Sequence, residues 1–206
     1  EMLEMASLGA KVMQPKSIQD ARLNRIDIEV RNSFKNISGS LITKRKNVSK
    51  KNIIRGVSFT KNDAKVTLIG VKDSPGVAAA IFEPLFKNSI NVDMVVQNIS
   101  SNKKETDLTF TIKKEDLSKT KKLIKVNNKI RFKKIVTDES VSKVSIIGVG
   151  MITTPGVTFR MFNALAKKNI NIQVISTSEI KISVLVKQQN LKKAVDVLHK
   201  EFKLDY

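Results

Sequence analysis

The chain contains no cysteine and no tryptophan, and only one histidine and one tyrosine occur among its 206 residues. Without cysteine it forms no disulfide, holds no thiolate-bound metal and uses no cysteine nucleophile. Its apolar runs fall well short of the roughly 20 residues of a membrane helix. No signal-peptide pattern opens the chain either. These absences predict a soluble, cytoplasmic protein that does not contact a membrane.

Acidic residues are also scarce relative to basic ones, and the formal net charge is +19. A nucleic-acid-binding surface is one explanation, because lysines release counterions from phosphates. Most of the basic residues are lysine, however, and they are spread along the chain. Arginines and exposed aromatic side chains, which read bases and stack on them, are few. The pattern favours a solvated lysine surface and no nucleic-acid partner.

Catalytic motifs are rare. His199, the only histidine, lies among lysines on the predicted last helix, where a surface position is expected. Gly-Val-Gly at residues 148–150 lacks the third glycine and the acidic residue of a dinucleotide-binding fingerprint. No phosphate-binding glycine-rich loop with its lysine occurs. The chain by itself is therefore predicted to have no catalytic residue, no metal and no cofactor of its own.

One pattern occurs twice in the sequence. "KVTLIGVKDSPGVAAAIFEPLFKNSINVDMVVQNIS" begins at Lys65, and "KVSIIGVGMITTPGVTFRMFNALAKKNINIQVISTS" begins at Lys143. Each copy reads as a buried strand, a loop with Pro-Gly-Val, an amphipathic helix, and a second strand opened by Ile-Asn. Further strand, helix and strand patterns complete the first copy as βαββαβ. This order is typical of the ferredoxin-like sandwich, so the predicted fold class is α+β with two such modules in tandem.

The element boundaries follow from the hydrophobic periods. In the first copy we expect strands at residues 66–71, 90–99, about 108–112 and 129–136, and helices at 76–87 and about 117–124. In the second copy we expect strands at residues 144–149, 170–176 and 180–186, and helices at 156–168 and 191–202. The second copy therefore lacks a fourth strand.

An open sheet edge is a liability that proteins usually cover. "NIIRGVSFT", residues 52–60, is strand-like and has no other evident partner. It is predicted to complete the second module, with the first module inserted. Module 1 then spans residues 63–140, and the discontinuous module 2 spans residues 47–62 and 141–206.

Residues 1–46 belong to neither module. "EMLEMASLGAK" reads as a helix that ends at Gly9, and the next segment reads as a helix from Pro15 to about Asn24, followed by a strand at residues 26–30. The segment begins in mid-pattern without an initiator methionine. We expect it to be the tail of a preceding domain.

A site for a free amino acid is predicted at the Pro-Gly turn of the first copy. The first amides of the following helix have no helical partner and can receive a carboxylate, and Asp73 can receive an ammonium group. Helix capping explains Asp73 equally well. Asn91, Asp93 and Gln97 are expected on the next strand near the same end, with Thr109 facing them. An ordinary edge or turn position is the alternative for each of these.

The second copy has no acid in its turn, which reads Met-Ile-Thr-Thr at residues 151–154. Its polar residues cluster instead at Ser176-Thr177-Ser178-Glu179, after the copy's second strand. Such a cluster lines a pocket or an interface, or forms a tight hairpin turn, and the sequence favours neither.

The chain resembles a known family at these residues. "DSPGVAAAIF", "INVDMVVQNIS", "TDLTFTI", "KVSIIGVGM", "PGVTFRMFNALAKKNINI" and "ISTSEIKISVLV" together resemble the paired ACT modules of bacterial aspartate kinase. Residues 1–34 resemble the last helices and strand of that enzyme's kinase domain. The family phosphorylates the β-carboxylate of aspartate with ATP, the first step toward lysine, threonine and methionine.

The resemblance implies a regulatory role in that enzyme. It implies feedback inhibition by lysine, threonine or both, a homodimer through the ACT modules, and a kinase domain or catalytic subunit as partner. The family's nucleotide and aspartate motifs lie in a part that this chain lacks. ATP and Mg²⁺ are therefore expected only in the full enzyme, and the chain alone is expected to be inactive.

The resemblance also implies which residues contact the effector. In the first module these are Asp73, Pro75, Gly76, Ala78, Asn91, Val92, Asp93, Gln97 and Thr109. Their second-module counterparts, at the module interface, are Asn171, Ile172, Ser176, Thr177, Ser178 and Glu179. The missing acid at residues 151–154 argues against equal binding by the two modules.

Two other function classes stay open at this point. One is a stand-alone amino-acid sensor, which would need no kinase segment. The other is a nucleic-acid-binding ferredoxin-like module, against which the single tyrosine argues because such modules stack bases on aromatic side chains.

Overall fold

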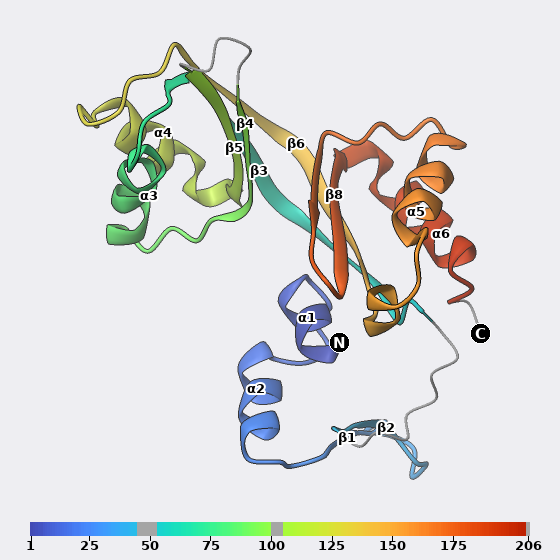
Figure 1. The fold of residues 1–206 in the computed structure, drawn as a ribbon. Helices are drawn as coiled ribbons and strands as arrows, with labels where there is room; N and C mark the ends of the chain where they lie inside the picture. Colours follow the sequence, from blue (N-terminus) through green and yellow to red (C-terminus); the bar gives the residue numbers. More distant parts are fainter. Residues whose placement is uncertain (45–52, 100–104, 205–206) are drawn as a thin grey trace.

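The computed structural model describes residues 1–44, 53–99 and 105–204 of the chain. Its centre is one six-stranded antiparallel sheet in the order β4-β5-β3-β6-β8-β7 (Figure 1). A separate two-stranded sheet is formed by β1 and β2, which come before it in the sequence. The strands of the large sheet are β3 (Gly56–Lys72), β4 (Asp93–Ile99), β5 (Glu105–Lys113), β6 (Lys134–Ile147), β7 (Val174–Thr177) and β8 (Lys181–Lys187).

Strands β3 and β6 run through both copies of the repeat (Figure 1). The first part of β3 pairs with the end of β6, from Gly56 opposite Ile147 to Thr60 opposite Lys143. The predicted pairing of residues 52–60 with the second copy is therefore confirmed for residues 56–60, while residue 52 lies outside the described residues. The second part of β3 pairs with β5 of the first copy.

The separate strands expected at residues 52–60 and 66–71 are thus one strand, and so are those expected near 129–136 and at 144–149. Residues 61–64 read as a polar break in the sequence, but Asp63 is buried, with 4% of its surface exposed. Its carboxylate accepts hydrogen bonds from Thr60 and, at 3.1 Å, from the Lys113 ammonium. These partners let a charged residue stay inside a continuous strand.

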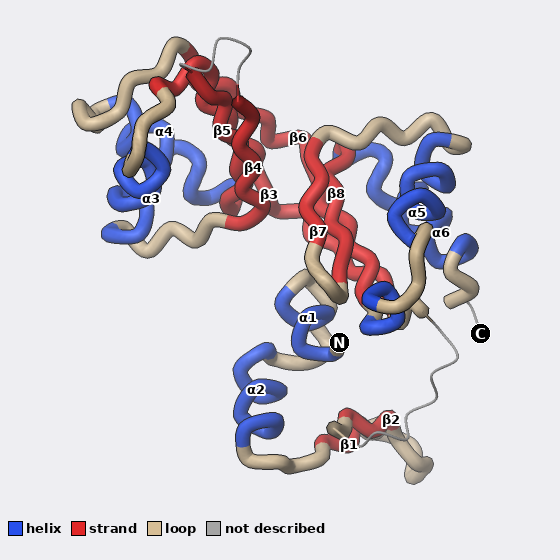
Figure 2. Tube along the Cα trace, viewed as in Figure 1, coloured by secondary structure: helices blue, strands red, loops and turns tan. Residues whose placement is uncertain are grey.

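Two helices cover each half of the sheet on its outer face (Figure 2). In the first half, α3 (Val77–Lys87) and α4 (Leu117–Lys125) pack on a core that includes Val66, Leu68 and Phe110. In the second half, α5 (Val157–Ala166) and α6 (Leu191–Glu201) pack on the inward-facing side chains of β6 and β8. Strand residues alternate between the two faces of a sheet, so the core-forming period-two pattern of the sequence is borne out.

The faces without helices meet at the centre of the molecule. Met94 of β4 packs there against Val174 and Leu185 of the second copy. Two polar contacts flank this cluster: the Lys143 ammonium donates to the Asp93 carboxylate, and the Lys65 ammonium donates to the Gln173 side-chain oxygen. We call these two pairs, together with the Met94 cluster, the central contact.

The N-terminal segment reaches the second half of the sheet through α1, while its other elements extend away from the sheet (Figure 1). It comprises α1 (Met2–Ser7), α2 (Pro15–Leu23), β1 (Ile28–Val30) and β2 (Ser40–Ile42), close to the predicted helices and strand. The Ser58 hydroxyl of β3 donates to the Met5 carbonyl, and a Cβ at Gly9 would stand 2.1 Å from the Phe59 carbonyl oxygen. The close approach of the two backbones at Gly9 therefore requires glycine. Within the described ranges, no helix has the length and apolar character needed to span a bilayer.

Candidate functional site

The Pro-Gly turns of the two copies share one backbone conformation. Gly76 has φ +87° and Gly156 has φ +88°, and each is the residue that precedes the first turn of a helix, α3 or α5. This left-handed conformation is readily adopted by glycine. In the first copy the turn is closed by the Val77 amide, which donates to the Ser74 carbonyl over 3.1 Å. The following first-turn amides of α3 have no partner four residues back in the helix, so they are available to an anion.

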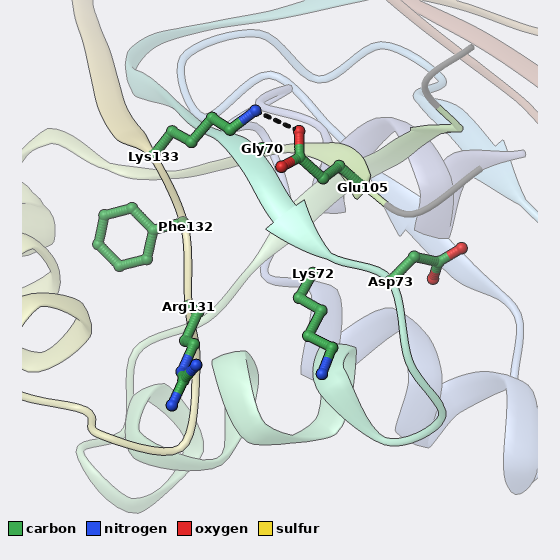
Figure 3. Close-up of a pocket in the computed structure, with 7 residues that line it drawn as sticks. All are labelled: Gly70, Lys72, Asp73, Glu105, Arg131, Phe132 and Lys133. Carbon is green, nitrogen blue, oxygen red and sulfur yellow. Dashed lines mark hydrogen bonds and ion pairs between the residues drawn. The ribbon is translucent and has the colours of Figure 1, made fainter. Parts of the chain in front are cut away.

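Asp73 lies at this turn with a free carboxylate. The N-terminus of α3 has no side-chain capping bond, so the capping role that the sequence left open for Asp73 is not adopted. In the part of the chain that the structure describes, no side chain or amide forms a hydrogen bond or an ion pair with the Asp73 carboxylate. An exposed carboxylate without a partner can receive an ammonium group, although in this structure it points away from the start of α3 (Figure 3).

A hollow of about 530 Å³ adjoins Asp73 (Figure 3). Residues of the segment before β6 line it, whereas Pro75, Gly76 and Ala78 of the turn before α3 do not. At its upper rim the Lys133 ammonium bonds the Glu105 carboxylate at 2.6 Å, while Lys72 and Arg131 extend together toward α3. The full lining comprises Gly70, Lys72, Asp73, Glu105, Arg131, Phe132 and Lys133.

The expectation that Asn91 and Asp93 lie near the same end as Asp73 is wrong. Asp93 is level with Thr111, which pairs with Lys65, whereas Lys72 is level with Glu105 at the other end of the ladder. The physical reason is the crossover. Because β3 and β4 are both antiparallel to β5, they run in the same direction, and α3 returns the chain to the end where β3 of this module begins.

Gln97 and Thr109 lie on different faces of the sheet. Gln97 is opposite Leu108, whose side chain packs in the core under α3, so Gln97 shares the helix-covered face at the outer edge. Thr109 alternates with Leu108 and Phe110 and therefore faces away from the helices. Its hydroxyl lies 3.0 Å from that of Thr67. The structure therefore does not bring Thr109 toward Asp73 or Gln97.

The starts of β4 and β7 meet at the central contact. Asp93 bonds Lys143 there, while Val92 packs on the core of the first module and Ile172 on that of the second. Asn171 precedes Ile172 and is exposed. These predicted effector residues of the two copies are thus close to one another, and all are distant from Asp73. Eight residues of strand separate Lys65, in the central contact, from Asp73, or about 25 Å.

The charge state of Asp93 follows from its surroundings. Burial favours the neutral carboxyl, but the hydrogen bond and charge of Lys143 outweigh it, with help from the Met94 amide and the charge of Lys181. Together they lower the pKa of Asp93 below its usual value. Asp93 is therefore a carboxylate at neutral pH and pairs with the Lys143 side chain, of which 6% is exposed.

The cluster of residues 176–179 forms a hairpin turn. Strand β7 ends at Thr177, and the Ser178 amide donates to the Lys181 carbonyl over 2.8 Å, which closes the turn before β8. Lys181 in turn pairs with Glu4 of α1 at 3.4 Å. The hairpin explanation for this cluster is therefore confirmed, and its role in a pocket or an interface stays a prediction.

A row of serines extends across the sheet from this hairpin. Ser58, Ser145, Ser183 and Ser176 are successive cross-strand neighbours on the face without helices. The hydroxyls of Ser145 and Ser183 are 2.7 Å apart and buried. Small side chains in this row let α1 approach the strands, which explains the alternating serines.

Sequence reasoning missed Lys72, Arg131 and the central lysines. Lys72 and Arg131 are far apart in the chain, and nothing in a lysine-rich sequence distinguishes them. Lys65 and Lys143 carry a usable signal, because both open their copy of the repeat at the same position. Their partners, Asp93 and Gln173, are also at equivalent positions in the two copies.

Comparison with known proteins identifies both modules as ACT domains. The family model of the ACT domain matches residues 66–127 and 144–202. An aspartate kinase of Pseudomonas fluorescens is 45% identical over 207 aligned residues, which cover 100% of this chain and 50% of that protein. The chain thus spans about half the length of the curated relatives that it matches.

Solved structures with the same fold include a regulatory subunit of aspartate kinase. That of the aspartate kinase from Thermus thermophilus, in a ligand-free form, is 33% identical with a TM-score of 0.68, over 73% of this chain and 99% of that one. A structure of aspartokinase alpha and beta subunits is 38% identical with a TM-score of 0.65, over the same shares. Two ACT modules and a regulatory subunit matched over nearly its whole length show that the chain belongs to the aspartate kinase family, as the regulatory part with paired ACT domains.

Proposed function

We propose that the chain controls an aspartate kinase by binding lysine, threonine or both as feedback inhibitors. In the full enzyme, a kinase domain or a catalytic subunit would bind ATP, Mg²⁺ and aspartate and phosphorylate the aspartate. The chain described here contributes no catalytic residue to that reaction. We also propose that this regulation takes place in the cytoplasm.

The observation that carries the proposal is the unpartnered Asp73 carboxylate in the turn that leads into α3, whose first-turn amides have no helical partner. An α-amino acid presents an ammonium and a carboxylate on one carbon, and these two groups fit an acid and a set of free amides. The second copy has the same turn conformation at Gly156 but no acid before it. The proposal therefore assigns the ammonium site to the first module.

Threonine is the first candidate for this site. The hollow beside Asp73 is lined by three cations, Lys72, Arg131 and Lys133, and one of them is neutralised by Glu105. A lysine side chain would be repelled by the other two, whereas a neutral side chain would not.

The remaining predicted contacts support a homodimer. Asn171 and Ile172 are far from Asp73 within one chain, so one site can include all three residues only if two chains contribute to it. Strands β4 and β7 end the six-stranded sheet on its two sides and leave an edge for pairing. In the proposed dimer, β4 of one chain lies beside β7 of the other. Sedimentation that gives only a 23.0 kDa monomer at high concentration, with and without amino acids, would exclude it.

Calorimetric titration with threonine and with lysine tests the site. Asp73→Ala removes one charge-assisted hydrogen bond, so the affinity should fall about tenfold or more. Asp116→Ala is the matched control, because Asp116 is also an acid before a helix of the first module but lies at α4. An Asp73→Ala variant that binds as tightly as the unmodified chain, or an unmodified chain that binds neither amino acid, would refute the assignment.

A further inference from the structure

Two cations stand side by side at the end of β3. The Lys72 amide donates to the Arg131 carbonyl over 3.1 Å, so these residues are neighbours across two adjacent segments. Their side chains extend to the same side of the hollow, away from the Lys133–Glu105 pair (Figure 3). Of the acids in residues 1–44, 53–99 and 105–204, none pairs with either cation.

Such an arrangement is unfavourable by itself. Like charges that face each other across neighbouring strands destabilise a sheet, and a nearby anion removes the penalty. Lys133, two residues from Arg131, has its counter-charge in Glu105 at 2.6 Å. Lys72 and Arg131 have none in the described protein, although both line the same hollow.

The second copy provides an internal comparison. Residues 65–72 align with residues 143–150 position by position, which makes Gly150 the counterpart of Lys72. The Lys133 amide bonds the Ile69 carbonyl, just as the Arg55 amide bonds the Ile147 carbonyl. This pattern makes Ile53 the counterpart of Arg131.

The counterpart pair is uncharged and tightly packed. A Cβ at Gly150 would stand 2.7 Å from the Cα of Ile53. The same place in the repeat therefore holds an apolar contact in the second copy and two cations beside a hollow in the first. The fold does not require charge here, since one copy is built without it.

We propose that Lys72 and Arg131 form a binding site for the oxyanion of a small molecule, a phosphate or a carboxylate group. The guanidinium offers paired donors in a plane, and the ammonium adds a point charge that can approach from the other side. The hollow of about 530 Å³ holds a small metabolite and not a polymer. This site lies in the same hollow as Asp73 but is formed by different residues, and it does not require that an amino-acid effector binds.

Calorimetric titration with inorganic pyrophosphate and with succinate, at constant ionic strength, tests the site and separates the phosphate from the carboxylate source. Lys72→Ala and Arg131→Ala should each weaken binding of the favoured anion about tenfold or more. Both side chains are exposed, so the variants should fold, and circular dichroism checks this. Lys122→Ala on α4 removes the same charge from an exposed position outside the hollow and should leave the affinity unchanged.

Asp73→Ala distinguishes this site from the amino-acid site. It removes a negative charge beside the hollow, so the affinity for the anion should stay equal or rise, while the affinity for an amino acid should fall. If neither anion binds in the millimolar range, or if Lys122→Ala weakens binding as much as Lys72→Ala does, the proposed site is wrong.

Discussion

Replacement of Asp93 by alanine should destabilise the fold more than replacement of its partner Lys143. The Lys143 side chain is 6% exposed and Asp93 is 52% exposed. Removal of Asp93 leaves a buried ammonium without its anion. Replacement of Lys143 by methionine leaves a half-exposed carboxylate that water can solvate, while the apolar stem is preserved. The order of the two effects follows from this difference in burial.

The loss of unfolding free energy expected for Asp93→Ala is that of one charge-assisted hydrogen bond. Such bonds contribute about 1.5–3 kcal/mol, and partial exposure of Asp93 favours the lower half of this range. We therefore expect Asp93→Ala to lower the free energy of unfolding by about 2 kcal/mol, which shifts the urea midpoint by about 1 M. Lys143→Met should lower it by less than about 1 kcal/mol.

The pH dependence gives an independent check. The folded-state pKa of Asp93 is lowered, so its stabilisation is present above the unfolded-state pKa of about 3.9. It is lost as the pH falls through the lower folded-state value. The difference in unfolding free energy between the unmodified chain and Asp93→Ala should therefore be full at neutral pH and shrink at acid pH.

Gln173→Ala is the matched control, because Gln173 occupies the position of Asp93 in the second copy and bonds Lys65. Its amide does not titrate, so the effect of this change should not depend on pH. Urea unfolding followed by circular dichroism measures all three variants. If Lys143→Met destabilises as much as Asp93→Ala, or if the effect of Asp93→Ala persists unchanged in acid, the central contact does not act as described.

Three further substitutions test the architecture. Gly9→Ala, whose Cβ would stand 2.1 Å from the Phe59 carbonyl oxygen at φ +116°, should release α1 from the sheet and expose the N-terminal segment to limited proteolysis. Gly76→Ala, with no heavy atom within 4 Å of the new Cβ, should leave α1 protected, and equal cleavage of both variants would contradict the contact. Phe110→Ala, at a fully buried position, should cost about 3–5 kcal/mol. Because β3 and β6 belong to both modules, hydrogen exchange should show both modules destabilised together, and loss of the first module alone would refute this.

The sequence predicts the repeat, its helices and the discontinuous second module, because these depend on periodicity and on counting strands. It does not predict that β3 continues through residues 61–64. That continuity depends on the two partners of the buried Asp63 carboxylate, which are Thr60 and Lys113. Lys113 is distant from Asp63 in the sequence. The proposed module boundaries at residues 62–63 and 140–141 therefore fall inside continuous strands.

The structure contains the turn predicted at Asp73 and Gly76, but it does not bring all of the neighbours expected for it to the same place. Asp73 and Gly76 are recognisable because a short turn before a helix has strong local rules. Asn91 and Asp93 come next in the sequence, at the start of the following strand. Because α3 crosses back over the sheet, this start lies at the opposite end of the sheet from Asp73. Lys72 and Arg131 could not be found, since their proximity arises only from pairing between distant segments.

The junction between the two halves of the β3–β6 ladder has a mechanical consequence. Register shifts between Thr60 and Asp63 and between Asp63 and Lys65 interrupt the ladder where the two copies meet. Such irregularities bend and twist strands locally, so we expect this junction to act as a joint about which the two halves of the sheet can twist. With Asp73 about 25 Å along the strand from Lys65, a rotation of about 10° at the joint displaces it by about 4 Å. A small rearrangement of the charges at the joint is thereby amplified into a movement as large as a side chain at the far ends of the molecule.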